Sequence, residues 1–141
     1  MRPDQIDLAR RLVACRGWRW MPGMSARRWS GHGEVSAVAR VSAPARETPW
    51  LSEGWLPDLT DPATLGCILA LVREAWRCPT AYVRQSTSRR VSDGAFAWEV
   101  CDLWLDAEAC RALGVDREGT VGSWGHGSEA EALVAALEAA P

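Results

Sequence analysis

Residues 62–77 are apolar on almost every side of a predicted helix, and this constrains the fold more than any other feature of the sequence. Asp61 precedes the segment as a good N-cap, Pro62 suits the first helical position, and Cys78-Pro79 ends it. The apolar side chains at helical spacing are Leu65, Ile68, Leu69, Val72 and Trp76, with Cys67, Ala70 and Leu71 beside them. A helix with so little polar surface is buried on most sides, so we expect it at the centre of the fold.

Shorter elements are predicted around this helix. Helical patterns cover residues 4–16, 106–113 and 129–139. The last of these follows Ser128, which stands at capping-box spacing from Glu131. Strand patterns cover residues 35–41, 81–85 and 95–105, and Asp93-Gly94 predicts a turn before the last strand. We expect loops at 25–34 and 43–61, apart from a short strand near 50–51.

The order of these elements predicts the α+β class, as a small, mainly antiparallel sheet packed against a central buried helix and terminal helices. A length of 141 residues suits one domain, which we predict over residues 1–141. No apolar run approaches the ~20 residues that span a bilayer. The N-terminus is charged and helical in pattern, unlike a secretory signal, so we expect a cytoplasmic protein.

Charge is distributed unevenly along the chain. Residues 10–46 hold eight arginines and one acid, whereas residues 92–141 hold two arginines and ten acids. All 16 basic residues are arginine, and nine of the eleven aromatic residues are tryptophan. The asymmetry predicts either a charged partner or two halves that face each other in the fold.

Arginine and tryptophan alternate most closely over residues 16–29. The candidate partner-binding residues there are Trp18, Arg19, Trp20, Arg27, Arg28 and Trp29. Both residue types are enriched at interface hot spots and also stack on nucleic-acid bases. The alternative is that Trp18 and Trp20 attach the first helix to the core. The acidic pI of 5.7 favours a protein partner over nucleic acid.

No catalytic signature accompanies these patterns, and we expect a non-enzymatic protein without a cofactor. His32 and His126 are the two histidines, both flanked by glycines. The glycine-rich loop 122–128 precedes a helix, but Glu129 and Glu131 in the first helical turn would repel a phosphate. Five cysteines without a CxxC pair predict neither a disulfide scaffold nor a metal site.

Three stretches carry a resemblance to a known family: GWRWMPGM at 17–24, LPDLTDPATLGCILALVREAW at 56–76 and WGHGSEAEALVAALEAAP at 124–141. Together they cover about a third of the chain, in order. The chain resembles a family of small uncharacterised proteins of bacteriophages and prophages of GC-rich bacteria. The resemblance implies expression in the cytoplasm of an infected bacterium, and it transfers no catalytic residue to this chain.

These observations lead to two main hypotheses. The first is a non-enzymatic phage accessory protein that binds a host or phage protein, such as a nucleic-acid-processing complex. It would inhibit or modulate a host protein machine, such as an antiviral defence complex in the manner of an anti-CRISPR protein. Asp93, Glu99 and Asp102 are an acidic alternative contact set, which would imitate a nucleic-acid backbone. The second is a nucleic-acid-binding accessory protein that uses the basic residues 10–46. A small hydrolase built on His32 or His126 is a third, less favoured reading.

Overall fold

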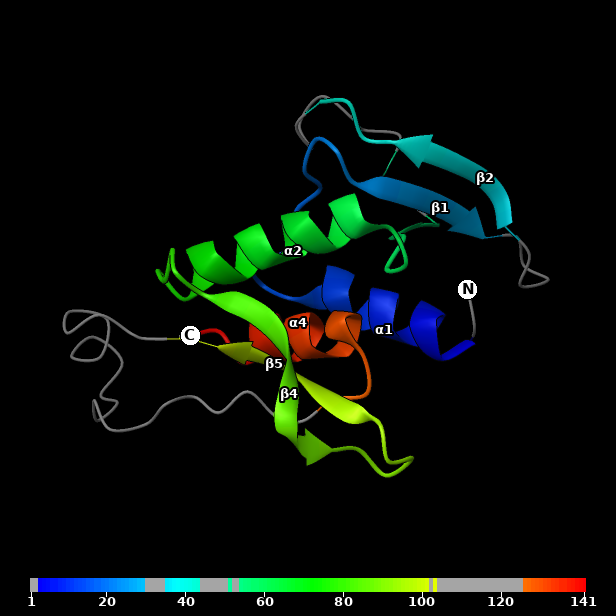
Figure 1. Cartoon of the computed structure of the whole chain (residues 1–141). Coiled ribbons are helices and arrows are strands. Elements are labelled where there is room, and N and C mark those ends of the chain that lie inside the picture. Colours follow the sequence, from blue (N-terminus) through cyan, green and yellow to red (C-terminus); the bar gives the residue numbers. More distant parts are fainter. Residues whose placement is uncertain (1–2, 30–34, 44–50, 52–53, 102, 104–125) are drawn as a thin grey trace. The chain divides into compact units, whose positions relative to one another are not determined.

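The computed structural model describes residues 3–29, 35–43, 51, 54–101, 103 and 126–141 (Figure 1). The chain divides into two compact units, residues 1–67 and residues 68–141. Helix α2 (Pro62–Ala75) begins in the first unit and ends in the second.

The first unit contains helix α1 (Pro3–Ala14) and a three-stranded antiparallel sheet in the order β2-β1-β3. The strands are β1 (Ser25–Trp29), β2 (Val35–Arg40) and β3 (Trp55–Pro57). Helix α1 contacts β3. In β2 the exposure alternates as the sequence predicted, since Ala37 and Ala39 are half-buried while Val38 and Arg40 are exposed.

Helix α2 begins where the sequence predicted. The Asp61 carboxylate accepts a hydrogen bond from the Thr64 backbone N–H at 2.9 Å, as an N-cap does. Ile68, Val72 and Trp76 are buried along one stripe. At the C-terminal end Arg77 adopts a positive φ of 50°, which turns the chain out of the helix.

The second unit contains an antiparallel hairpin and a C-terminal helix. Strands β4 (Tyr82–Arg90) and β5 (Phe96–Cys101) pair with each other, and α4 (Glu129–Glu138) packs against both. The predicted turn is confirmed, since the Val91 N–H donates to the Ala95 carbonyl at 2.9 Å. Gly94 supplies the positive φ of 84° that this turn requires.

Helix α4 shows a modified form of the predicted capping box. The Ser128 hydroxyl accepts from the Glu131 N–H at 3.2 Å. The Glu131 carboxylate in turn accepts from the N–H of Gly127, one residue before the cap, at 2.9 Å. The predicted inner stripe is confirmed, because Leu133, Val134 and Leu137 are all buried.

The predicted α+β class is confirmed, with antiparallel strands and helices that pack against them. Several details differ from the sequence predictions. The strands form two small sheets instead of one, and the strand predicted over 95–105 ends at Cys101. Strands β1 and β3 occupy predicted loops, and β4 continues five residues past the predicted end at residue 85, to Arg90. The predicted helix at 106–113 lies outside the described residues. Within the described residues, no helix has the length and apolar character needed to cross a membrane.

Candidate protein-binding surface

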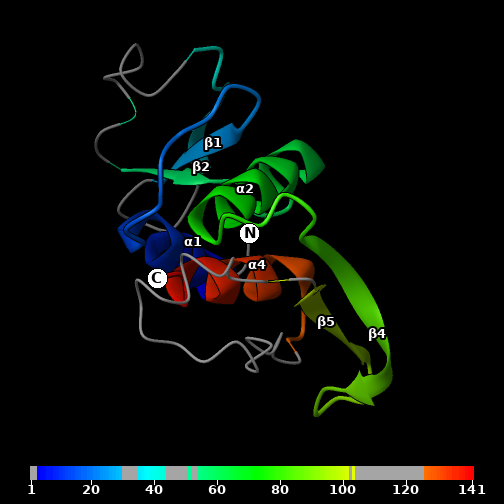
Figure 2. The same ribbon diagram turned by 90° about the vertical axis from the view of Figure 1, so that its left-hand side faces the viewer.

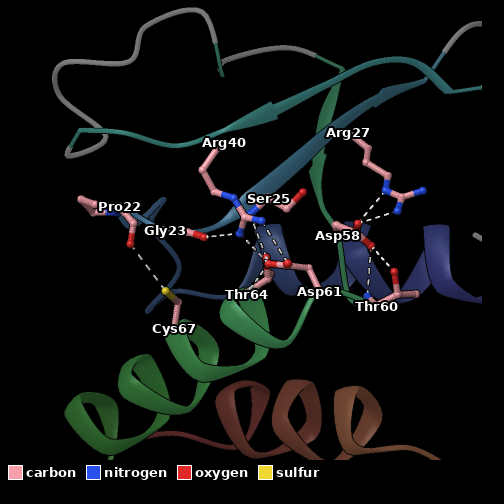
Figure 3. Close-up of polar contacts among 10 residues, drawn as sticks. All are labelled: Pro22, Gly23, Ser25, Arg27, Arg40, Asp58, Thr60, Asp61, Thr64 and Cys67. Carbon is pink, nitrogen blue, oxygen red and sulfur yellow. Dashed lines mark hydrogen bonds and ion pairs between the residues drawn. The ribbon is translucent and has the colours of Figure 1, made fainter.

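Strand β1 carries two of the candidate arginines, and Arg27 is held by an ion pair. Its Nε and Nη2 atoms lie 2.7 and 2.6 Å from Oδ2 of Asp58 (Figure 3). Oδ1 of Asp58 accepts from the N–H and hydroxyl of Thr60 at 3.1 and 2.6 Å. The Asp58 side chain is only 6% exposed, so burial of its charge depends on these donors. Arg27 is therefore fixed in one orientation at the end of β3.

A second ion pair joins β2 to the start of α2. Arg40 contacts both carboxylate oxygens of Asp61, at 2.9 and 3.2 Å, and donates to the Gly23 carbonyl at 2.6 Å (Figure 3). The Thr64 hydroxyl also donates to Asp61 at 2.8 Å, and accepts from the Ser25 N–H at 2.8 Å. Burial raises the pKa of Asp61, but the hydrogen bonds from Arg40 and Thr64 outweigh it and lower the pKa overall.

The strand register places both arginines on one face of the sheet. Arg27 lies directly opposite Val38 on β2 and Leu56 on β3, and directly opposed residues point to the same side. Arg40 is two residues beyond Val38 and shares that side. We call these four residues the Arg–Val face. Val38 is 62% exposed, which makes it the most exposed of the large apolar side chains that the structure describes.

The other face of the same sheet is buried around Ala26. Ala26 is fully buried, and its partner Pro57 on β3 is buried as well. Because successive strand residues alternate between the two faces, burial of Ala26 leaves its neighbour Arg27 on the outer side. Arg28, two residues after Ala26 on that face, is exposed, so β1 carries an arginine on each side of the sheet.

Trp18 and Trp20 lie together before β1. Their ring centroids are 5.3 Å apart in an edge-to-face arrangement, and both side chains are half-buried. Arg19 between them is exposed. The chain then turns at Gly23, whose φ is +97° and whose N–H donates to the Val41 carbonyl at 2.8 Å. The pair is thus compatible both with partner binding and with attachment of the first helix to the core, since each side chain is partly covered and partly accessible.

The last two residues of β1 differ in accessibility. Arg28 is exposed, whereas Trp29 is half-buried beside an irregularity in the pairing with β2. Nε1 of Trp29 is buried and has no hydrogen-bond acceptor in the described part of the chain. Such a donor is costly to bury, so this end of β1 is a less favourable core position than Ala26.

The acidic candidate residues do not form an exposed cluster in the described structure. Asp93 accepts from the Ala95 N–H at 2.9 Å within the hairpin turn. Glu99 is buried on β5, and its carboxylate accepts from Nε of Arg84 at 2.8 Å. Asp102 lies outside the described residues. Glu99 therefore forms an ion pair with Arg84 inside the second unit.

Groups that could support catalysis are sparse among the residues described. His126 pairs through its backbone with Trp98, whereas His32 and residues 122–125 of the glycine-rich loop lie outside the described residues. Burial raises the pKa of the Cys67 thiol, which donates to the Pro22 carbonyl at 3.7 Å. In the parts of the chain that the structure covers, no three His, Cys, Asp or Glu residues gather as a metal site would require.

Sequence reasoning missed part of the Arg–Val face. Asp61 was expected only as a helix cap, and Asp58, Val38 and Arg40 were not singled out. One local signal could have identified these residues: the two acids of PDLTD, three residues apart, follow the arginine-rich residues 10–46 and could pair with arginines there.

Comparison with protein-family models, with curated proteins and with solved structures finds no match for this chain.

Proposed function

We propose that this chain is a non-enzymatic accessory protein of a bacteriophage or prophage that acts in the cytoplasm of the infected bacterium. It binds a protein machine of the host and inhibits or modulates it, with an antiviral defence complex as the target, in the manner of an anti-CRISPR protein. The resemblance of residues 17–24, 56–76 and 124–141 to phage proteins supports this setting.

The Arg–Val face is the observation that carries the binding function. An exposed apolar centre with a polar rim is the usual composition of a protein interface. Here Val38 is the apolar centre, Arg27 lies opposite it on β1, and Arg40 follows two residues further along β2. Because their carboxylate partners already hold both guanidinium groups, little side-chain entropy is lost when a partner binds.

The same ion pairs weigh against nucleic acid as the partner. Of the eight arginines in residues 10–46, Arg10, Arg27 and Arg40 each pair with a carboxylate of the chain. Binding to phosphates depends on cations that replace counterions, and a paired arginine contributes less to this exchange. A gel shift titrated with salt tests the alternative, which requires a complex at low salt that weakens steeply as salt is added.

The direct test is affinity purification from bacterial host lysate with quantitative mass spectrometry. Three tagged chains are compared: wild type, Val38→Glu, and Ser42→Glu as a matched control at another exposed position of the first unit. We expect one stoichiometric host protein with wild type and Ser42→Glu, and its loss with Val38→Glu. If all three chains retain the same host protein, the Arg–Val face is not its binding site. If no host protein is recovered with any chain, protein binding itself is contradicted.

The inhibitory role has its own test. The chain is expressed in a host with an active defence system, and the plating efficiency of a sensitive phage is measured. We expect plating to rise with wild type and Ser42→Glu and to stay low with Val38→Glu. Equal plating with and without the chain, across hosts with different defence systems, would contradict the anti-defence role.

A further inference from the structure

Strand β4 has an edge whose backbone groups point outward. Trp98 on β5 uses both its N–H and its C=O on His126, at 2.8 and 3.0 Å, on the side away from β4. Trp98 and its β4 partner Gln85 are therefore a pair that exchanges no backbone hydrogen bonds. In an antiparallel ladder the N–H and C=O of such a residue point away from the partner strand, so those of Gln85 face outward.

The same alternation gives a second outward position. Hydrogen-bonded and non-hydrogen-bonded pairs alternate along the ladder, and the register is regular from Tyr82 to Gln85. Val83 consequently also directs its N–H and C=O outward. Among the described residues β4 pairs only with β5, and Figure 2 shows it along the outer side of that strand. Val83 and Gln85, two residues apart, thus have no strand partner on this side within the described part of the chain.

The side chains beside this edge are basic and aromatic. Arg84 is 57% exposed, and its Nε donates to the buried Glu99. Glu99 thereby orients the Arg84 guanidinium through Nε. Tyr82, two residues away on the same face, is 38% exposed. Toward the hairpin turn the Arg90 guanidinium lies 4.2 Å from the centroid of the Phe96 ring.

We propose that the outer edge of β4 is a second binding site, which takes an extended acidic segment of a partner protein as an added β-strand. This site lies in the second unit and does not depend on the Arg–Val face. Residues 82–90 contain three arginines and no acid, so an acidic segment complements the strand. The outward N–H and C=O groups match a peptide backbone, and a nucleic acid offers no such alternating donors and acceptors. An apolar residue of the added strand packs on Tyr82, and an acidic residue pairs with Arg84.

The test uses a fluorescent octapeptide of alternating glutamate and valine, whose binding to the full chain is followed by anisotropy. Gln85→Pro removes one outward N–H and leaves the β4–β5 ladder bonds in place, because proline is tolerated where the N–H faces solvent. Gln85→Ala is the matched control, since it removes the same side chain and keeps the N–H. We expect about tenfold weaker binding with Gln85→Pro and less than about twofold change with Gln85→Ala.

Charge and ligand class are tested in the same assay. We expect the Arg84→Gln variant to bind the acidic peptide about fivefold more weakly, or weaker still, than wild type does. We expect wild type to bind a peptide of alternating lysine and valine more weakly than the acidic peptide by about the same factor. Equal binding of the two peptides, or equal binding by Gln85→Pro and Gln85→Ala, would overturn the proposal. So would binding of a fluorescent thymidine oligonucleotide in place of the acidic peptide. If circular dichroism shows that Gln85→Pro is unfolded, an acidic peptide N-methylated at alternate residues replaces it on wild type, with the same expected loss.

Discussion

Replacement of Asp61 tests whether one carboxylate joins the sheet of the first unit to α2. In Asp61→Ala the helix loses its N-cap, which costs about 1 kcal/mol. It also loses the ion pair with Arg40, which is worth about 0.5–1 kcal/mol because that side chain is 54% exposed and screened by solvent. We therefore expect the free energy of unfolding to fall by about 2 kcal/mol.

Asp61→Asn separates the two contributions. Asparagine caps a helix as well as aspartate does, so this variant should lose only the ion pair, about 0.5–1 kcal/mol. Asp7→Ala is the control for an exposed pair, because Asp7 and Arg10 are 71% and 67% exposed. We expect a change below about 0.5 kcal/mol there.

The assay is equilibrium urea unfolding followed by far-UV circular dichroism, with Arg40→Ala added to complete a double-mutant cycle. The cycle should return a coupling free energy near that of the ion pair. The reasoning is refuted if Asp61→Ala and Asp61→Asn cost the same, because the cap would then contribute nothing. It is also refuted if Asp61→Ala costs no more than Asp7→Ala.

Three further predictions concern acid, a buried indole and two glycines. The pKa of Asp61 is lowered in the fold, so its stabilisation is complete above the ordinary value of 3.8 and is lost as the pH falls through the lower folded value. Unfolding measured between about pH 5 and pH 2 should therefore depend less on pH in Asp61→Asn, and an unchanged dependence would contradict this. Trp76 is 2% exposed and its Nε1 donates to the Ala136 carbonyl at 2.7 Å, so Trp76→Phe should cost about 2–3 kcal/mol in urea unfolding. A cost below that of a surface substitution would show that this hydrogen bond is not formed in solution. Gly66→Ala should raise the midpoint temperature of thermal unfolding, since an added Cβ meets open space within α2. Gly94→Ala should lower the midpoint by about as much, because Gly94 has a positive φ that alanine adopts poorly. Midpoint shifts of the same sign in the two variants would contradict both expectations.

Local sequence signals predicted the helices that have caps and apolar stripes. Asp61 and Pro62 mark the start of α2, and Ser128 with Glu131 marks the start of α4. These signals act over three or four residues, so they are present in the sequence whatever the rest of the chain does. The alternation of β2 was readable for the same reason, since a strand with one covered face repeats every two residues.

Strand β1 was missed because the reason for it lies elsewhere in the chain. SARRW has small and charged residues and no apolar alternation, which is typical of a loop. Its charge at Arg27 is accommodated by Asp58, 31 residues later, and its backbone at Ser25 by the Thr64 hydroxyl, 39 residues later. No local pattern contains either pairing, and β3 is too short at three residues to show a pattern at all.

For the candidate site too, part was predictable from the sequence and part depended on the tertiary structure. From the sequence alone, the concentration of arginine and tryptophan in residues 16–29 identified the segment, because residue type is a local property. Only the tertiary structure decided which of these side chains are held and which are accessible. It fixed Arg27 on Asp58, buried Glu99 against Arg84, and left Val38 exposed beside two arginines. Ion pairs and strand register depend on residues that are distant in the chain, so their outcome is set only when the strands come together.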